Sequence, residues 1–268
     1  MTLRLACAIA HPDDESLGFG GTLARYAAEG AEVSLIVATR GERGRYGDGT
    51  APHPGPEELG KVREAELRAA AEALGVRHVR FLGYRDGALD QADAVEASGR
   101  VAACLRELRP HVVLTFDPFG VYGHPDHVAI SQLTLAGVLR AASPGPVAGS
   151  RDEPHQVQKA YYHAWTVAVR DRYESVFKPL KSTVDGVVRP SVTWPEWSVT
   201  TVTPAHEHWE RVWDAVRCHR TQIAQYGSLT RLTDDDQCAL WGPQEYYRVY
   251  SLVNGGRTRE TDLFEGLR

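Results

Sequence analysis

Two short clusters of histidine and aspartate, each placed after an apolar run, constrain this fold more than any other feature. The first cluster, AHPDDE at 10–15, ends the apolar run 3–10, and the second, HPDH at 124–127, follows the run 112–116. A short apolar run bounded by turn residues is typical of a buried strand. Open α/β sheets build their sites at the carboxyl ends of such strands. We therefore expect both clusters to lie at one edge of a single sheet.

Strand and helix patterns alternate through the first half of the chain. Strands are predicted at 3–10, 32–39, 79–82 and 112–116, and helices at 20–29, 57–74, 93–108 and about 126–141. The clearest helix, 57–74, carries the i,i+4 pair Glu64–Arg68 and ends at Gly75. This order predicts an α/β fold with a mostly parallel sheet and helices on both faces.

The pattern changes after residue 142. Residues 143–154 contain three prolines, two glycines and two serines, which is typical of a linker. Beyond it, strands are predicted at 159–169, near 187, near 199 and at 246–253, with a helix at 205–226. We expect one domain over 1–268, made of a β/α core at 1–142, an insertion at 143–204 that shapes the pocket, and a C-terminal helix and strand at 205–268.

Composition narrows the class of protein. The chain has 268 residues, 24% of them charged, and a net charge of −5, so no basic face for nucleic acid is expected. No apolar run is long enough to span a bilayer, and the N-terminus lacks the basic region of a signal peptide. The four cysteines form no CxxC pair, which predicts buried, reduced thiols. A cytoplasmic protein is expected, and the sequence indicates no oligomeric state.

The two clusters hold the ligand types of a catalytic zinc site. Such a site has three nitrogen or oxygen ligands and one position left open for water. His11, Asp14 and His127 supply two imidazoles and one carboxylate. His124 lies three residues before His127, so both face the same way on one helical turn, and one of them can reach the reacting group. The same donor set also accepts Fe²⁺.

The sequence AHPDDE near the N-terminus, together with YGHPDH at 122–127, resembles the LmbE-like, or PIG-L-like, zinc deacetylase family. Four further segments agree with that family: TRGERG at 39–44, KVREAE at 61–66, LGYRDG at 82–87 and CHRTQ at 218–222. The resemblance implies a Rossmann-like fold and removal of acetyl groups from N-acetylglucosamine conjugates. It covers residues 1 to about 140 well and 143–204 poorly.

The resemblance also implies a role for each matching residue. The metal ligands are His11, Asp14 and His127, and the general base is Asp13. His124 stabilises the oxyanion or protonates the leaving amine, and Asp126 orients it. The Tyr122 hydroxyl is a further candidate donor. The residues expected to bind the sugar are Arg63, Asp86, Glu42 and His219.

Three functions are compatible with these residues. The leading prediction is a zinc-dependent deacetylase that acts on a small acetylated amino sugar, such as a glucosaminyl-inositol or glucosaminyl-malate precursor. The second is an amidase that cleaves thiol S-conjugates at the same site, with a larger acyl pocket. The third is a sugar- or nucleotide-binding module without catalysis, which an intact set of ligands and base argues against.

Overall fold

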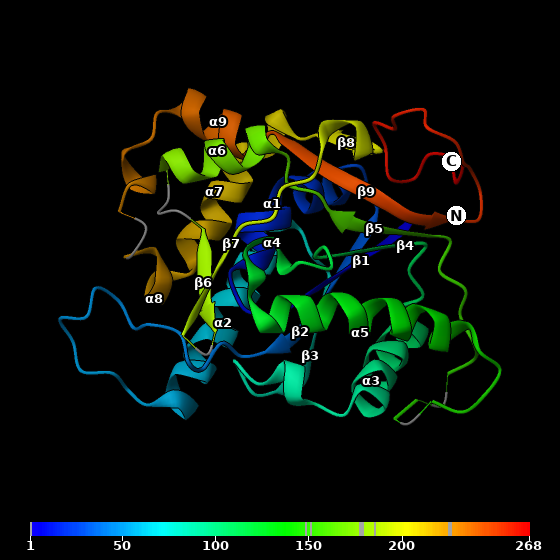
Figure 1. Ribbon diagram of the computed structural model, residues 1–268, viewed down its shortest axis with the longest axis horizontal. Helices are drawn as coiled ribbons and strands as arrows, with labels where there is room; N and C mark the ends of the chain where they lie inside the picture. The colour runs from blue at the N-terminus through cyan, green and yellow to red at the C-terminus, as the bar shows by residue number, and fades with distance from the viewer. Residues whose placement is uncertain (1, 148, 151, 177–179, 185, 225–226) are drawn as a thin grey trace.

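A seven-stranded sheet runs through the centre of the molecule (Figure 1). The computed structural model describes residues 2–147, 149–150, 152–176, 180–184, 186–224 and 227–268. The strand order is β3-β2-β1-β4-β5-β9-β8, with β1 (Arg4–Ile9), β2 (Glu32–Thr39), β3 (His78–Tyr84), β4 (Val112–Thr115), β5 (Lys159–His163), β8 (Thr201–Pro204) and β9 (Pro243–Ser251). The first five strands are parallel, and β9 is antiparallel to both of its neighbours. The predicted mostly parallel sheet is confirmed.

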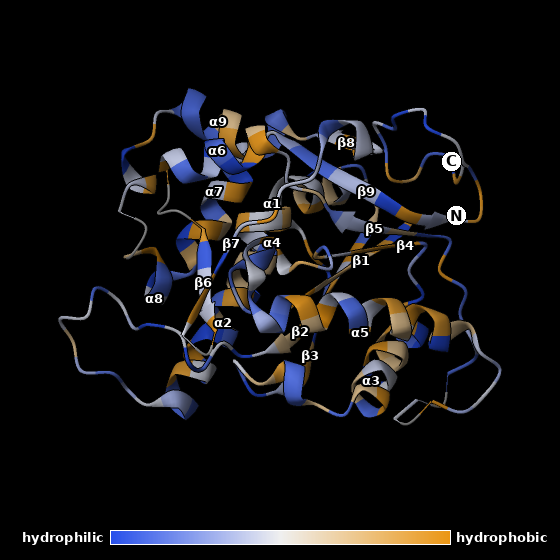
Figure 2. Cartoon of the chain, viewed as in Figure 1, coloured by the Kyte–Doolittle hydropathy of each residue, from blue (hydrophilic) through white to orange (hydrophobic). Residues whose placement is uncertain are grey.

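Helices cover both faces of this sheet. On one face, α1 (Asp14–Ala28) and α2 (Pro56–Leu74) pack with α7 (Trp209–Cys218), and on the other, α3 (Ala94–Leu108) packs with α5 (Pro125–Ala142). The shorter helices are α4 (Gly120–Gly123), α6 (Val167–Val176), α8 (Arg220–Ile223) and α9 (Asp234–Trp241). Figure 2 shows apolar residues gathered on β1 and β4, which helices cover on both sides. No described helix combines the length and apolarity that crossing a membrane requires.

The helix predicted at 20–29 begins earlier, at Asp14, directly after the first histidine and aspartate cluster. The glycines within it allow close packing rather than ending the helix. A Cβ on Gly20 would lie 2.9 Å from a methyl of Val212, and one on Gly21 would lie 2.5 Å from the carbonyl oxygen of Trp241. Only glycine lets α7 and the end of α9 approach α1 so closely.

Other differences from the prediction fall in the second half. The strand predicted at 159–169 ends at His163, because the Thr166 hydroxyl accepts the backbone N–H of Val169 at 3.4 Å and starts α6. The helix predicted at 205–226 is broken at His219, which has φ −80° and ψ 61°. Helix α9 was not predicted. All four cysteines are free, as expected, but only the one in β1 is fully buried.

Residues 143–204, expected as an insertion, contribute to the main sheet. They supply β5 beside β4 and β8 at the far edge, and they add a separate antiparallel pair, β6 (Lys181–Val184) and β7 (Val187–Pro190). The last segment of the chain returns to this side of the sheet, where residue 260 bridges to residue 201. The second half therefore extends the sheet begun by the first half.

The buried carboxylate of Glu260 holds the C-terminal segment against the sheet. Glu260 is 1% exposed and lies 2.7 Å from the Lys159 Nζ and 2.8 Å from an Arg248 nitrogen. It also accepts hydrogen bonds from the hydroxyls of Tyr161 at 2.8 Å and Thr201 at 2.7 Å. Burial opposes ionisation, but these donors lower the pKa of Glu260 to about 2.

The Glu260 cluster predicts a specific loss of stability in acid. The stabilisation is complete above the unfolded-chain pKa of about 4.3 and is lost as the pH falls toward 2, because the folded pKa is the lower one. Glu260→Gln should reduce the free energy of unfolding at pH 7 by about 3 kcal/mol, since it leaves Lys159 without its buried partner. Urea denaturation between pH 3 and 7 measures both effects. An equal pH dependence in the variant and the wild type would contradict the assignment.

Candidate metal centre and pocket

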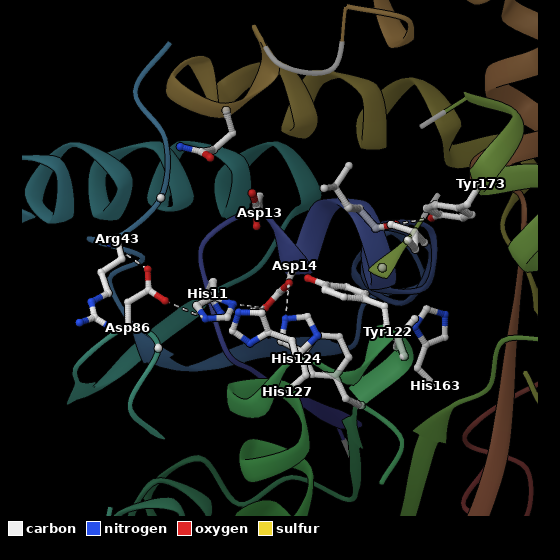
Figure 3. Close-up of a pocket in the computed structure, with 18 of the residues that line it drawn as sticks. His11, Asp13, Asp14, Arg43, Asp86, Tyr122, His124, His127, His163 and Tyr173 are labelled. Atoms are coloured by element: carbon white, nitrogen blue, oxygen red, sulfur yellow. Dashed lines mark hydrogen bonds and ion pairs between the residues drawn. The ribbon is translucent and has the colours of Figure 1, made fainter. Parts of the chain in front are cut away.

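A cavity of about 410 Å³ lies at the carboxyl ends of β1 and β4. The turn after β1 brings in the residues from His11 onward, and the segment from β4 into α5 brings in residues 116–127. The strand order reverses here, since β2 lies on one side of β1 and β4 on the other. Open α/β sheets hold their ligands at such a reversal. The structure thus brings the two clusters together (Figure 3).

Three imidazoles converge at the centre of this cavity. His11, His124 and His127 each offer a ring nitrogen, and these nitrogens lie within 4.8 Å of one another. The Asp14 carboxylate lies beside them, with one oxygen 3.4 Å from His127 Nε2 and the other 3.6 Å from His11 Nδ1. Burial would raise the pKa of Asp14, but the neighbouring imidazoles hold it well below its usual range.

The other nitrogen of His11 faces carboxylates. Its Nε2 lies 3.0 Å from Asp126 and 3.2 Å from Asp86. A carboxylate that accepts this N–H fixes the ring and leaves Nδ1 free to bind a metal. Asp126 was expected to orient His124, but its side chain contacts His11 instead. Its oxygens also accept the backbone N–H groups of Gly87 at 2.7 Å and Leu89 at 3.0 Å.

The surroundings of His127 indicate whether this site fits a metal ion. Its side chain is 2% exposed, and neither ring nitrogen has a hydrogen-bond partner among the described residues. Burial lowers the pKa of His127 to about 3, so the ring is neutral at neutral pH. Phe116 stacks on it at 4.0 Å and holds its orientation. An unpartnered buried polar group costs about 1–3 kcal/mol, and a metal ion beside two imidazoles and a carboxylate would remove that cost.

Asp13 is held next to this centre in a strained conformation. Its φ is 101°, which non-glycine residues rarely adopt, and its backbone N–H donates to Glu15 at 3.0 Å. Its carboxylate lies 3.2 Å from Arg63, which also donates to the carbonyl oxygens of Gly41 and Pro12. Burial raises the pKa of Asp13 to about 6, although Arg63 opposes the shift.

His124 lies at the N-cap of α5. Its Nδ1 accepts the backbone N–H of Asp126 at 3.2 Å, so the proton of the neutral ring is on Nε2. Tyr122 packs its ring edge against His127 with 5.1 Å between centroids. Figure 3 shows the Tyr122 hydroxyl directed toward Asp14. Both residues line the cavity and present hydrogen-bond donors to it.

The four residues expected to bind the sugar fall into two groups. Arg63 and Asp86 line the cavity, and Asp86 accepts the backbone N–H of Arg43 at 2.9 Å. Hydrogen bonds to His11 outweigh burial and lower the pKa of Asp86 to about 2. Glu42 does not line the cavity, because its carboxylate turns back to accept the backbone N–H of Asp86 at 2.9 Å.

His219 also lies behind the cavity wall rather than on it. Its Nε2 is 2.6 Å from the Glu15 carboxylate, which in turn accepts the Asp13 backbone N–H. Burial would lower the pKa of His219, but Glu15 raises it above its ordinary value. Its contacts therefore run through Glu15 to the backbone of Asp13, and the side chain does not face the cavity. Sequence analysis missed Glu15, although its place in AHPDDE and its total burial in α1 make it a third acidic member of the cluster.

The cavity has a polar end and an apolar end on either side of the imidazoles (Figure 3). Arg43 and Asp86 lie at the polar end, and Tyr173 lies at the apolar end. The cavity lining also includes the polar side chains of Arg63 and Gln222 and several apolar ones, which are Leu17, Phe116, Val121, Trp165 and Leu180. His163 lies there too, and burial lowers its pKa to about 3, so it carries no charge at neutral pH. Sequence analysis did not assign His163, Tyr173 or Leu180 to the site.

Comparisons with known proteins agree with this geometry. The family model described as PIG-L, GlcNAc-PI de-N-acetylase, matches residues 7–138. A protein of Kineococcus radiotolerans is 36% identical over 98% of this chain and 83% of its own length. A protein of Streptomyces avermitilis is 37% identical over 98% of this chain and 97% of its own length. Both are named 1D-myo-inositol 2-acetamido-2-deoxy-alpha-D-glucopyranoside deacetylase.

A solved structure has the same fold. The conserved protein TT1542 from Thermus thermophilus is 26% identical, with a TM-score of 0.65 over 95% of this chain and 98% of that one. The two named deacetylases exceed 30% identity over nearly the whole of this chain. The chain therefore belongs to the PIG-L family of metal-dependent deacetylases.

Proposed function

We propose that this protein removes the acetyl group from a small N-acetylglucosamine conjugate of the glucosaminyl-inositol class. The observation that carries the proposal is the meeting of three imidazoles, the Asp14 carboxylate and the neighbouring Asp13 carboxylate in one cavity. The names of the curated relatives support the substrate class. Family membership argues against a binding module without catalysis.

His11, Asp14 and His127 would hold the metal. Two imidazoles and a carboxylate suit zinc, and Fe²⁺ is an alternative with the same ligands. A bound zinc ion would lower the pKa of a water molecule and polarise the amide carbonyl. Asp126 and Asp86 support the site through His11 Nε2.

Side chains of the protein carry out the proton transfer, the stabilisation of the oxyanion and the binding of the sugar. Asp13 accepts a proton from the attacking water, whose oxygen bonds to the acetyl carbon. Negative charge develops on the carbonyl oxygen, and the Nε2–H of His124 and the Tyr122 hydroxyl can donate hydrogen bonds to it. The carbon–nitrogen bond then breaks, and the proton passes to the amine, so the products are acetate and the free amino sugar. Arg63 and Asp86 bind sugar hydroxyls at the polar end of the cavity.

Replacing Asp13 tests its role as the base. Asp13→Asn should reduce kcat by about 10²- to 10⁴-fold, because the amide cannot take the proton, while the metal content stays the same. Release of primary amine and metal analysis by mass spectrometry measure the two quantities. Asp214→Asn, at a carboxylate 65% exposed, serves as the control and should stay within twofold of the wild type. Wild-type turnover by Asp13→Asn would remove Asp13 as the base.

Metal binding should also stabilise the fold through His127. At a free zinc concentration about 100 times the Kd, the free energy of unfolding should rise by about 2.7 kcal/mol. His127→Ala should abolish this increase, whereas His53→Ala, in the exposed loop after β2, should retain it. Urea denaturation with and without a chelator makes the measurement. A zinc-dependent increase that survives in His127→Ala would place the metal elsewhere.

The apolar end of the cavity favours a second candidate, the amidase that cleaves thiol S-conjugates. An acetyl methyl needs little room, whereas the cavity has further apolar lining from Trp165, Tyr173 and Leu180. A larger acyl group would bury further apolar surface there, at about 0.8 kcal/mol per methylene.

A comparison of two amides of the same glucosaminyl-inositol separates these candidates. The two substrates are the acetyl amide and the S-conjugated N-acetylcysteinyl amide, which has the longer acyl group. A deacetylase should show the higher kcat/KM with the acetyl amide, because the longer acyl group would add no stabilisation of the transition state. Faster hydrolysis of that substrate would contradict the deacetylase proposal and support the amidase.

A further inference from the structure

The loop that follows β4 carries Tyr122 on an unusual backbone. Gly120, Val121 and Gly123 all have positive φ, at 65°, 64° and 73°. Val121 combines its φ with ψ −61°, which is the strained form of the γ-turn and is rare for a β-branched residue. Such conformations persist only where the surrounding structure fixes them. The contacts around residues 117–123 must therefore supply that constraint.

The first constraint comes from within the loop. The Asp117 side chain is fully buried and accepts the backbone N–H groups of Val121 at 2.9 Å and Phe119 at 3.1 Å. Its second oxygen accepts the indole N–H of Trp194 at 2.7 Å. A buried carboxylate needs such partners, so the loop and Trp194 are held to each other.

The other constraints come from Ser182 and Val192. The backbone N–H of Val192 donates to the carbonyl oxygen of Val121 at 2.9 Å. The Ser182 hydroxyl donates to the carbonyl oxygen of Tyr122 at 3.0 Å. Together with the Trp194 contact, these bonds hold the loop at residues 117, 121 and 122. All three donors lie outside residues 7–138, the part of the chain that the family model matches.

We propose that Ser182, Val192 and Trp194, here called the clamp, position the Tyr122 hydroxyl for the hydrolysis, and this inference rests on the proposed function. Tyr122 lies between the imidazoles and the apolar end of the cavity, with its hydroxyl toward Asp14 (Figure 3). A small displacement of such a donor weakens its bond to the developing oxyanion more than it weakens binding of the substrate. The clamp should therefore act on kcat rather than on KM.

Trp194→Phe removes one clamp donor with little change in shape. The phenyl ring can keep the packing on Tyr247, which lies 5.0 Å from Trp194 between centroids, but the bond to Asp117 is lost. We expect kcat to fall about tenfold while KM and the metal content stay within twofold. Trp197→Phe is the matched control, since Trp197 is 79% exposed, and should leave both constants unchanged. Ser182→Ala removes a second donor and replaces Trp194→Phe if that variant does not fold.

A double-mutant cycle then asks whether the clamp acts through Tyr122. If it does, Trp194→Phe should lower kcat in the wild type and cause no further loss in the Tyr122→Phe background. Equal losses in both backgrounds, an effect confined to KM, or an unchanged kcat in both clamp variants would each overturn the proposal.

A spectroscopic measurement separates failure of this inference from failure of the proposed function. With 3-fluorotyrosine at position 122, the ¹⁹F resonance should shift in Trp194→Phe and Ser182→Ala but not in Trp197→Phe. A shift without any amide hydrolysis by the wild type would retain the clamp and reject the hydrolase. An unshifted resonance in both clamp variants would reject the clamp, whatever the activity.

Discussion

The parallel pairing of β1 with β4 is the constraint on which the site depends. Its register sets Ala8 beside Thr115, so the chain leaves both strands at the same edge of the sheet. A slip of one residue would turn the side chains of a strand to the opposite face. Because both strands are packed on both faces, such a slip would disrupt the close packing of their side chains. The turn after β1 and the segment from β4 into α5 therefore begin side by side, and they bring His11 to His124 and His127.

Neighbouring carboxylates acquire different roles because their surroundings differ. Asp14 faces imidazoles, and this keeps it ionised, as its proposed role as a metal ligand requires. Asp13, one residue earlier, lies beside Arg63 with its side chain 14% exposed, and partial burial raises its pKa to about 6. Asp126 accepts hydrogen bonds from two backbone N–H groups and contacts Nε2 of His11. Carboxylates whose environments separate their pKa values can divide ligand and base roles between them.

The second half of the chain acts mainly as support for this centre. β5 and β9 extend the sheet, and the buried Glu260 fastens the C-terminal segment to them. Ser182 and Trp194 hold the loop that carries Tyr122. Glu15 and His219 form a layer behind Asp13. Residues far from the motifs thus hold in place residues that line the cavity.

The sequence alone determined the elements and the chemistry of the first half. Apolar runs and helix signals predicted the parallel strands, and AHPDDE with HPDH predicted a His/Asp cluster, because these patterns are local and depend on neighbouring residues. The partner of each side chain was decided only by the tertiary structure. Three contacts join distant segments of the chain. Asp126 contacts His11, Glu42 accepts the backbone N–H of Asp86, and His219 contacts Glu15. Hydrogen bonds across such distances depend on how the elements pack, which no local pattern encodes.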